Sequence, residues 1–289
     1  MACGGGCQDH VDIISFRISL YGEKGNYSVM ADLLSVITSS DKRRKLLLLL
    51  QHEPKALDEI KHTLNVTATG MIPQIRILEK RNLVKQEGRK YALTELGHVV
   101  TTHLNPLVKT LEVIEKQEEF WCEHDIRSIP SPLLTKINEL GDFQIIENSI
   151  EELYEPHKEF LDNIQKSKKV SGISPIVHPI YPNFFLQLAE KGTDISLILT
   201  RNAFNKIENE YKDLLVRGLS FNNAYLYVSD DDMKLACMVT DIYFSISLFF
   251  KNGVFDSRND LVSFDESALL WGEELFNYYK GRSHKIENL

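Results

Sequence analysis

The 289-residue sequence has few cysteines and no long hydrophobic runs. Its longest uninterrupted apolar runs, such as Leu46–Leu50, have five residues, whereas a membrane-spanning helix needs roughly 18 to 20. No secretory leader, with a charged start and a following apolar stretch, opens the chain. These absences predict a cytoplasmic protein without a membrane partner.

The cysteines do not make a disulfide framework, because Cys122 and Cys237 stand alone and only Cys3 and Cys7 lie close together. His10 follows that pair, so a metal site is one interpretation, although a fourth ligand and a second Cys-x-x-Cys are missing. The other interpretation, which we favour, is a reduced and mobile N-terminal segment. The sequence therefore predicts no metal and no cofactor.

Charge is unevenly distributed along the chain. The whole sequence carries 33 Lys and Arg against 41 Asp and Glu, a net charge of −8. Residues 1–35 have 2 basic and 4 acidic side chains, residues 36–105 have 12 and 7, and residues 106–289 have 19 and 30, which gives −2, +5 and −11. The basic middle segment suits a polyanion such as DNA, and a chance excess of Lys and Arg is the alternative.

The segment 36–105 has the pattern of a winged helix-turn-helix. A first helix, capped by Ser40 and ending near Leu50, starts basic and becomes strongly apolar. Apolar residues at spacings of three and four then predict a short second helix over Leu57–Leu64, closed by Asn65. Two short helices followed by a third match the shape that enters a major groove.

The third helix is the predicted recognition helix. Met71, Ile75 and Leu78 form its buried side. Pro73 lies inside it and should kink it near Thr69, either as an adaptation to packing or to curve the helix along the groove. The side chains that we expect to contact DNA are Thr67, Thr69 and Gln74, at base edges or phosphates, and Arg76 and Lys80, at phosphates.

Two short strand-like runs around Glu87–Gly88 predict a hairpin with basic residues at its tip. In a winged helix this hairpin is the wing. Arg89 and Lys90 would reach the DNA backbone or the minor groove beside the recognition helix, and a solvated hairpin tip is the alternative.

These residues resemble a known family. The stretches Asn65–Thr69 and Leu78–Val84 are similar to the recognition-helix segment of ArsR-like winged-helix regulators, although Asn82 stands where that pattern usually has glycine. Three stretches farther on resemble the effector-type domain of archaeal methanogenesis regulatory proteins. They are Ile173–Pro179, Val239–Asp241 and Trp271–Tyr279. The resemblance covers about Met30 to Arg282 and implies an archaeal transcriptional regulator. Residues 1–29 fall outside it, and Met30 is a reasonable start of translation.

Helical spacing of apolar residues continues after the hairpin. Thr94 can cap a helix that Asn105–Pro106 interrupts, and Leu107, Leu111 and Ile114 then resume the spacing, so we expect two linked helices. In a winged-helix regulator such a helix often pairs with its symmetry mate, which predicts a homodimer. Packing of this stripe on its own C-terminal domain is the alternative.

From Leu133 onward helical and strand patterns alternate, which predicts an α/β domain with a mixed sheet. Helices are predicted at 151–165, 182–191, 204–216 and 266–279, and strands at 170–173, 195–199, 224–228, 235–239 and 243–250. The short links between the last strands predict that this part of the sheet is antiparallel. The sheet resembles the phospholipase-D-like domains of some archaeal sugar-responsive regulators.

The sequence lacks the motifs that would make this domain catalytic. The phospholipase-D motif needs lysine two residues after histidine, but His178 is followed by Pro179 and Ile180. Nucleophile-elbow, zinc-peptidase, dinucleotide and P-loop motifs are also missing. We therefore predict that the protein is not an enzyme.

A ligand site is predicted instead. His178 and Tyr181 follow a strand and precede a helix, the place where α/β sheets bind ligands. Asp241 and Trp271 complete the predicted ligand-binding residues, although core packing is the more common role of such a tryptophan. Asp256 and Asp260 are better explained by turn chemistry around Gly253 and Asn259 than by ligand binding.

The prediction is a sequence-specific, DNA-binding transcriptional regulator that responds to a small-molecule or protein effector, with methanogenesis genes as implied targets. Double-stranded DNA and that effector are its expected partners. The alternatives are an enzyme with an accessory winged helix, which the missing motifs oppose, and a protein-interaction adaptor, which the basic wing opposes. The predicted parts are an N-terminal extension with a leading helix (1–35), the DNA-binding domain (36–105), a linker or dimerisation helix (106–124) and an α/β effector-sensing domain (125–289).

Overall fold

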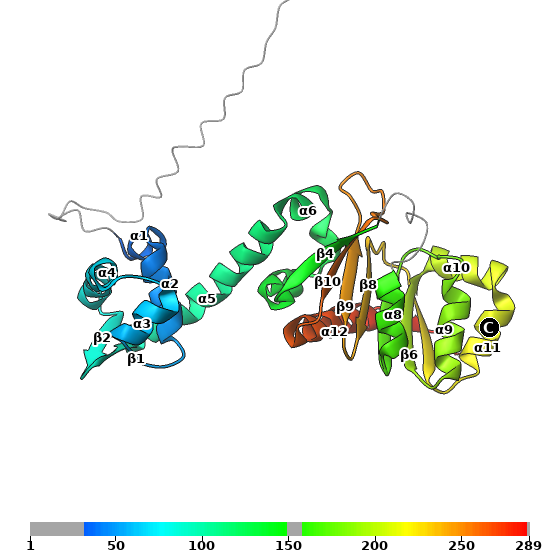
Figure 1. Cartoon of the computed structure of the whole chain (residues 1–289). Coiled ribbons are helices and arrows are strands. Elements are labelled where there is room, and N and C mark those ends of the chain that lie inside the picture. Colours follow the sequence, from blue (N-terminus) through cyan, green and yellow to red (C-terminus); the bar gives the residue numbers. More distant parts are fainter. Residues whose placement is uncertain (1–31, 149–157, 288–289) are drawn as a thin grey trace, which may run out of the picture. The chain divides into compact units, whose positions relative to one another are not determined.

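The chain is described by a computed structural model that covers residues 32–148 and 158–287 (Figure 1). It divides into two compact units, Met1–His98 (unit 1) and Val99–Leu289 (unit 2). The predictions on Cys3, Cys7 and His10 lie outside the described residues, as does the first part of the helix predicted from residue 151. Over the described ranges, no helix is long and apolar enough to cross a membrane.

Unit 1 contains the predicted three helices and hairpin, plus a leading helix and a two-residue strand beside the hairpin. Its elements are α1 (Leu33–Thr38), α2 (Asp41–Leu50), β1 (Lys55–Ala56), α3 (Leu57–Leu64), α4 (Ala68–Lys80), β2 (Val84–Glu87), β3 (Lys90–Leu93) and the start of α5 (Glu95–Lys116). The three strands pair antiparallel in the order β1-β3-β2. Three helices followed by this small sheet form a winged helix-turn-helix.

Local signals set the ends of these helices. The Ser40 side chain accepts a hydrogen bond from the Arg43 amide at the start of α2, and Thr67 Oγ1 accepts one from Gly70 N at the start of α4. Asn65 ends α3 with a φ of 50°, and Asn82 has a φ of 55° after α4. Asparagine tolerates this left-handed backbone, which is why Asn82 can replace the glycine of the related pattern.

Both prolines predicted to disturb helices lie inside continuous helices. Pro73 lies within α4, and Pro106 within α5. The prediction of two helices separated at Asn105–Pro106 was therefore wrong. A proline removes one helical hydrogen bond and its ring crowds the carbonyl four residues earlier. Leu104 and Val113 are buried on either side of it along α5, so packing supports the helix through the proline.

The start of α5 lies very close to the base of the hairpin. Thr94 Oγ1 accepts a hydrogen bond from Gly97 N at 3.0 Å, and Thr94 N donates one to the Leu83 carbonyl. A Cβ on Gly97 would lie 2.0 Å from the Leu83 carbonyl oxygen. The residue at position 97 must therefore lack a side chain if α5 is to start here.

Unit 2 contains one eight-stranded sheet and helices on both of its faces. Besides the rest of α5, its helices are α6 (Glu118–Glu123), α7 (Ser131–Leu134), α8 (Lys158–Lys166), α9 (Tyr181–Glu190), α10 (Arg201–Glu210), α11 (Lys212–Leu219) and α12 (Glu266–Lys280). Its strands are β4 (Phe143–Glu147), β5 (Lys169–Ser174), β6 (Asp194–Thr200), β7 (Ala224–Ser229), β8 (Leu235–Thr240), β9 (Phe244–Leu248), β10 (Asn259–Ser263) and β11 (His284–Lys285).

The strand order is β11-β7-β6-β5-β8-β9-β10-β4. Strands β5, β6 and β7 are parallel, and every other pairing is antiparallel. This confirms a mixed α/β sheet. The helix predicted over 204–216 is in fact two helices, α10 and α11, because the backbone of Tyr211 between them leaves the helical conformation, with φ −134° and ψ 31°.

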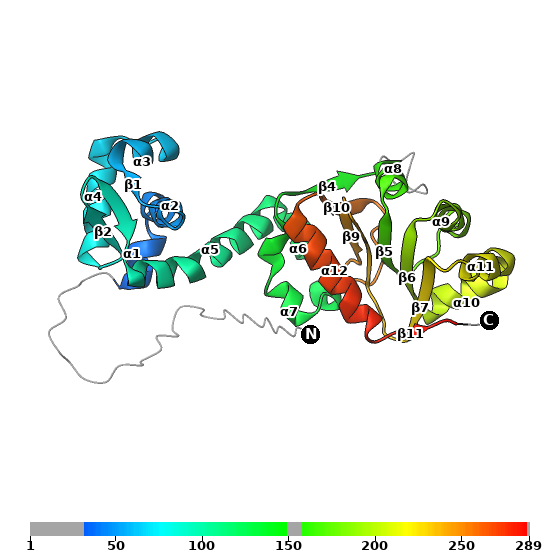
Figure 2. The ribbon, with the colours of Figure 1, turned by 90° about the horizontal axis from the view of Figure 1, so that it is seen from below.

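The two faces of the sheet carry different helices, with α12 on one face and α8, α9 and α11 on the other (Figure 2). On the first face Trp271 packs edge-on against Phe244, with ring centroids 5.7 Å apart. Gly272 allows this close approach, since a Cβ there would lie 2.4 Å from the Phe244 ring. The second face is less tightly filled, and the cavity described below lies over it.

Candidate functional site

Unit 1 presents one polar face of α4. Thr69, Pro73, Arg76 and Lys80 repeat at spacings of four, three and four, and all four are exposed. Residues at such spacings share one side of a helix. Thr67, at the cap, is also exposed, and its Oγ1 lies 3.2 Å from Thr69 Oγ1. Four of the five predicted contacts on this helix therefore lie at its accessible face and start.

Gln74 is the exception. It is half-buried, and its Oε1 accepts hydrogen bonds from Arg43 Nη1 at 2.6 Å and Ser40 Oγ at 3.4 Å. Arg43 is itself buried, and its Nε donates to the Val36 carbonyl. The Gln74 side chain thus joins α4 to the start of α2 and is turned away from the exposed face.

The wing and α4 carry cations that other side chains do not neutralise. Arg89 and Lys90 are exposed at the hairpin tip, where Gly88 takes a φ of 62°. By contrast Lys85 pairs with Glu87 at 2.7 Å, and Lys61 pairs with Asp58 at 2.8 Å. Within the described part of the chain, the exposed cations of unit 1 that make no ion pair include Arg76, Lys80, Arg89, Lys90 and Lys42.

Sequence reasoning missed Lys42. Its ammonium lies against the first turn of α4, where a Cβ on Gly70 would be 3.0 Å from Nζ. The positive end of a helix dipole also lies at that turn. The basic residues at the start of α2 are visible in the sequence. Only the fold shows that Lys42, at the start of α2, lies next to the start of α4.

Unit 2 contains a cavity of about 620 Å³ between the second face of the sheet and the helices α8, α9, α10 and α11. Its size is within the range of small-molecule sites. The strand order reverses at β5, which has β6 on one side and β8 on the other. Ligand sites of α/β sheets are found at such a reversal, beyond the carboxyl end of the strand.

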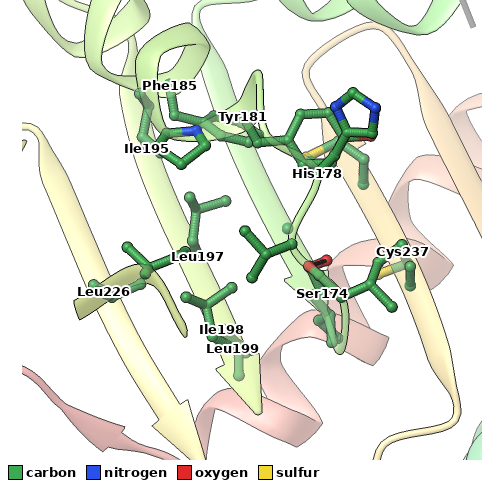
Figure 3. Close-up of a pocket in the computed structure, with 18 of the residues that line it drawn as sticks. Ser174, His178, Tyr181, Phe185, Ile195, Leu197, Ile198, Leu199, Leu226 and Cys237 are labelled. Carbon is green, nitrogen blue, oxygen red and sulfur yellow. Dashed lines mark hydrogen bonds between the residues drawn. The ribbon is translucent and has the colours of Figure 1, made fainter. Parts of the chain in front are cut away.

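His178 and Tyr181 lie where that rule expects them. They follow β5, and they lie together at one end of the cavity with ring centroids 5.3 Å apart (Figure 3). The Tyr181 amide donates to the His178 carbonyl at 3.1 Å as α9 begins. Burial, and secondarily the negative charge of Asp260, raises the pKa of Tyr181, so its hydroxyl keeps its proton and remains a hydrogen-bond donor.

Asp241 and Trp271 do not lie beside His178 and Tyr181 in the cavity. Asp241 is exposed in the turn between β8 and β9, and its Oδ1 accepts from the amides of Lys168 and Lys169 at 2.9 and 3.3 Å. Trp271 is fully buried on the opposite face of the sheet, where its Nε1 donates to the Leu133 carbonyl at 3.0 Å. Neither residue lines the cavity, and both have clear structural roles.

The polar lining that sequence reasoning did not select comes from β9 and β10. Ser245 and Ser247 alternate on the cavity side of β9, and the Ser247 hydroxyl donates to Asp260 Oδ1 on β10. Cys237 also contributes to the lining, but burial raises the pKa of its thiol to about 12. A thiol with so high a pKa is a poor nucleophile.

A buried ion pair borders the same region. His124 Nε2 lies 3.0 Å from Asp256 Oδ2, and both side chains are only 2% exposed. His124 Nδ1 lies 2.7 Å from the Phe120 carbonyl, so both ring nitrogens face acceptors, as in the protonated imidazole. Burial opposes the charge of His124, but the hydrogen bonds to Asp256 and Phe120 raise its pKa above the ordinary value.

Asp256 is held from several directions. It accepts hydrogen bonds from the amides of Arg258 and Asn259 and from Asn259 Nδ2, as well as from His124. Burial would raise its pKa, yet these donors lower it below the ordinary value. The turn role predicted for Asp256 is thus present, together with an ion pair to a residue 132 positions away. No group of three His, Cys, Asp or Glu side chains that suits a metal ion occurs among residues 32–148 and 158–287.

Two solved structures align with most of the chain at low similarity. The archaeal chromatin protein TrmBL2 has a TM-score of 0.40 and 12% identity, covering 85% of this chain and 94% of its own. An IclR transcriptional regulator from Alicyclobacillus acidocaldarius has a TM-score of 0.23 and 8% identity, covering 82% and 94%. Scores this low do not establish a shared fold.

Sequence comparisons are more informative. Residues 31–116 match the family described as the HVO_A0261 N-terminal domain, and residues 153–282 match the methanogenesis regulatory protein FilR1 middle domain. The methanogenesis regulatory protein FilR1 of Methanothrix harundinacea (strain 6Ac) is 27% identical over 264 residues, and the alignment covers 89% of this chain and 59% of that relative. The chain thus spans 59% of the length of that relative. The predicted resemblance to methanogenesis regulatory proteins is confirmed, and residues 153–282 are similar to the FilR1 middle domain.

Proposed function

We propose that the protein is a dimeric DNA-binding transcriptional regulator whose unit 2 binds an effector. The observation that carries the proposal is the set of exposed, unneutralised cations on α4 and the wing of a winged helix-turn-helix. Such cations bind phosphates and release counterions from DNA. The name of the related FilR1 supports genes of methanogenesis as targets, and a regulator that acts on such genes would work in the cytoplasm.

In this proposal α4 enters the major groove with Thr69, Arg76 and Lys80 toward the DNA. Thr67 and Lys42 contact the backbone at the start of the helix, and Arg89 and Lys90 contact phosphates or the minor groove from the wing. Gln74 is given a different role, because its amide oxygen is bonded to Arg43 and Ser40. It positions α4 on α2.

The dimer is proposed to form through α5. Leu107, Leu111 and Ile114 are 53%, 47% and 37% exposed and repeat at spacings of four and three. Leu96 and Val99 are also exposed, about two to three turns before Leu107 on α5. An exposed apolar stripe of this length is the pattern of a helix that packs on a second helix, and self-pairing gives the symmetry of a palindromic DNA site.

Unit 2 is proposed to bind a ligand without transforming it. The cavity has the size and place of a ligand site, and burial raises the pKa of its cysteine, which makes that thiol a poor nucleophile. The phospholipase-D-like and ArsR-like likenesses, and the division of the chain at 36–105, 106–124 and 125–289, stay predictions.

The test is fluorescence anisotropy of the full chain with DNA selected from random sequence. We expect a selected sequence to bind with a steep dependence on salt and far more tightly than a scrambled one. Leu107→Glu with Leu111→Glu should convert the dimer to a monomer in sedimentation and weaken binding to a palindrome, whereas Leu270→Glu, at an exposed leucine on α12, should do neither. Equal binding to scrambled DNA would refute sequence-specific regulation.

A further inference from the structure

The second face of the unit 2 sheet carries apolar side chains that the fold covers only in part. Leu197 lies on β6, which has a strand on either side, yet it is only half-buried. Leu215 and Leu219 of α11 and Phe185 of α9 are also half-buried, and all four residues line the cavity. Contact between water and such surface is unfavourable, so a ligand that covers these side chains gains free energy from apolar burial.

The floor of the cavity is apolar at its centre as well. Gly172 of β5 lies between Leu197 of β6 and Met238 of β8 in the sheet. A Cβ on Gly172 would lie 3.0 Å from Leu197 Cδ2 and 2.8 Å from the Met238 methyl group, so both side chains extend over the glycine. Hydrocarbon therefore covers the backbone of β5 on this side.

The cavity retains further space beside α11. Gly218 follows Leu214 by four residues and Leu215 by three, which places it on their side of the helix, and all three line the cavity. Nothing lies within 4 Å of a Cβ built on Gly218. A side chain added here would enter the cavity without meeting the protein, so this position can test how far a ligand extends.

An anionic ligand would lack a cationic partner in the cavity wall. As far as the structure describes that wall, it contains neither lysine nor arginine, the side chains that stay cationic at neutral pH. A carboxylate or phosphate moved into such surroundings loses hydration that no such cation replaces. The wall therefore disfavours anions.

The carboxylates of the described wall, Asp256 and Asp260, are already bonded within the protein. Asp256 forms the buried ion pair with His124 and accepts a hydrogen bond from Asn259 Nδ2 at 2.9 Å. Asp260 accepts a hydrogen bond from the Ser247 hydroxyl. An ammonium ligand would give up its hydration for carboxylates that already have partners, so the wall favours no charge of either sign on a ligand.

One polar group of the wall suits an uncharged ligand. Tyr181 lines the cavity beside His178, and its ring packs edge-on against Phe185 with centroids 5.9 Å apart. Because burial raises the pKa of Tyr181, its phenol stays protonated. A neutral hydroxyl can donate a hydrogen bond to a carbonyl, ether or hydroxyl oxygen without placing a charge in the cavity.

We propose that this cavity binds an uncharged, mainly apolar molecule with an oxygen acceptor, the apolar part against Leu197, Leu215 and Leu219 and the oxygen at the Tyr181 hydroxyl. The proposal rests on the ligand-binding part of the proposed function and names the chemical class of the ligand. A cavity of about 620 Å³ admits a molecule of drug size. Apolar burial then provides the affinity, and the hydrogen bond from Tyr181 orients the molecule.

The first experiment compares three probes with the same number of carbons by isothermal titration of the full protein. Octan-2-one is neutral, octanoate is an anion and octylamine is a cation. The titrations are made at neutral pH and high salt, which screens the binding of ions to the protein surface. We expect octan-2-one to bind at least tenfold more tightly than either ion, a difference of about 1.4 kcal/mol. Either ion binding as tightly as the ketone, or no binding by any of the three, would overturn the proposal.

A first pair of variants tests the oxygen contact. Tyr181→Phe keeps the ring and removes the donor, so it should weaken octan-2-one about fivefold, as expected for one net hydrogen bond. It should change the affinity for propylbenzene, which has no oxygen, by less than twofold. Tyr278→Phe, on α12 at the opposite face of the sheet, should change neither affinity. Unaltered binding of the ketone by Tyr181→Phe would contradict the assignment of its oxygen to Tyr181.

A second pair tests the place of the apolar part. Gly218→Leu should weaken decan-2-one several-fold and hexan-2-one much less, whereas Val216→Leu, at an exposed position of the same helix, should weaken neither. If Gly218→Leu does not fold, Gly218→Ala, which adds one methyl group, should act in the same direction with a smaller effect. Equal losses for the two ketones, or no loss, in a folded variant would contradict this placement.

DNA binding is measured on the same preparations. Failure of all three eight-carbon probes with intact DNA binding would refute only the ligand class proposed here. Loss of sequence-specific DNA binding in the unaltered protein would refute the proposed function itself.

Discussion

The two units of this chain place their charged side chains in opposite ways. Among the residues that the structure describes, Arg76 and Lys80 on α4 and Arg89 and Lys90 at the wing tip are exposed cations of unit 1 that make no ion pair. Unit 2 places His124 and Asp256 inside, where each is hydrogen-bonded on several sides, and several of its exposed cations, such as Lys136 and Lys169, are paired. Exposed cations without an ion pair are available to a large polyanion such as DNA. Buried charges that are hydrogen-bonded on several sides instead stabilise the fold of unit 2 around its cavity.

The largest effect should come from breaking the internal pair. His124→Ala leaves Asp256 buried without its partner, which in comparable cases costs about 3 to 5 kcal/mol. Trp121 and Trp271 both lie in unit 2 and are both buried, so tryptophan fluorescence during urea unfolding of the full chain reports this unit. Lys136→Met, which breaks the exposed pair with Glu274, should cost at most about 1 kcal/mol. Similar losses in the two variants would erase the contrast between the units.

The next effect concerns the free cations of unit 1. Arg89→Ala with Lys90→Ala should weaken binding to all DNA sequences alike and flatten the dependence of log affinity on log salt by up to about two, roughly 0.9 per lost phosphate contact. Lys61→Ala removes a cation that is already paired with Asp58 and should change the slope far less. An equal change in slope would mean that net charge, not the position of the wing, drives binding.

A third prediction uses pH. Because the folded pKa of His124 is raised, its stabilisation is complete below its ordinary value of 6.5 and is lost as the pH rises through the folded pKa. Because the pKa of Asp256 is lowered, its stabilisation is complete above 3.8 and is lost as the pH falls through its folded pKa.

The pair should therefore stabilise unit 2 most between about pH 4 and 6.5. Each unit by which the folded pKa of His124 exceeds the unfolded one contributes about 1.4 kcal/mol. Tryptophan-monitored unfolding at pH 6 and pH 9 should show a smaller difference between the unaltered protein and His124→Gln at the higher pH. A difference that stays constant would show that His124 is neutral in the fold.

The smallest effect on DNA recognition should come from Gln74. Gln74→Ala removes a hydrogen bond that the buried Arg43 guanidinium donates, worth about 1.5 to 3 kcal/mol in general. We expect faster hydrogen exchange in α2 and α4 with the same preferred DNA sequence. A relaxed preference at one base position would instead support the base contact that the sequence predicted for Gln74.

The sequence predicted unit 1 well because its signals are local. Caps such as Ser40 and Thr67, the left-handed Asn65 and the turn at Gly88 each act within a few residues. Strands β4 and β10 were missed because they pair with each other across more than 100 residues, as in the pairing of Ser263 with Phe143. No local pattern reports such a pairing.

The candidate ligand site was predicted only in part, for a similar reason. His178 and Tyr181 could be found because the end of a strand and the start of a helix are visible in sequence. Asp241 and Trp271 were selected by residue type, and the fold uses them to hold the start of β5 and to pack α12. The alternation of Ser245 and Ser247 in an otherwise apolar strand was a signal for a polar cavity wall that could have been found.

Gly97 gives unit 1 a point of low mutational tolerance. Even alanine would place its Cβ 2.0 Å from the Leu83 carbonyl oxygen, and backbone cannot move aside as a side chain can. Selection for function in a library of single substitutions should therefore deplete every replacement at position 97, while Gly218, whose surroundings are open, accepts at least small ones. A residue without a side chain would thus rank among the least replaceable positions of the unit.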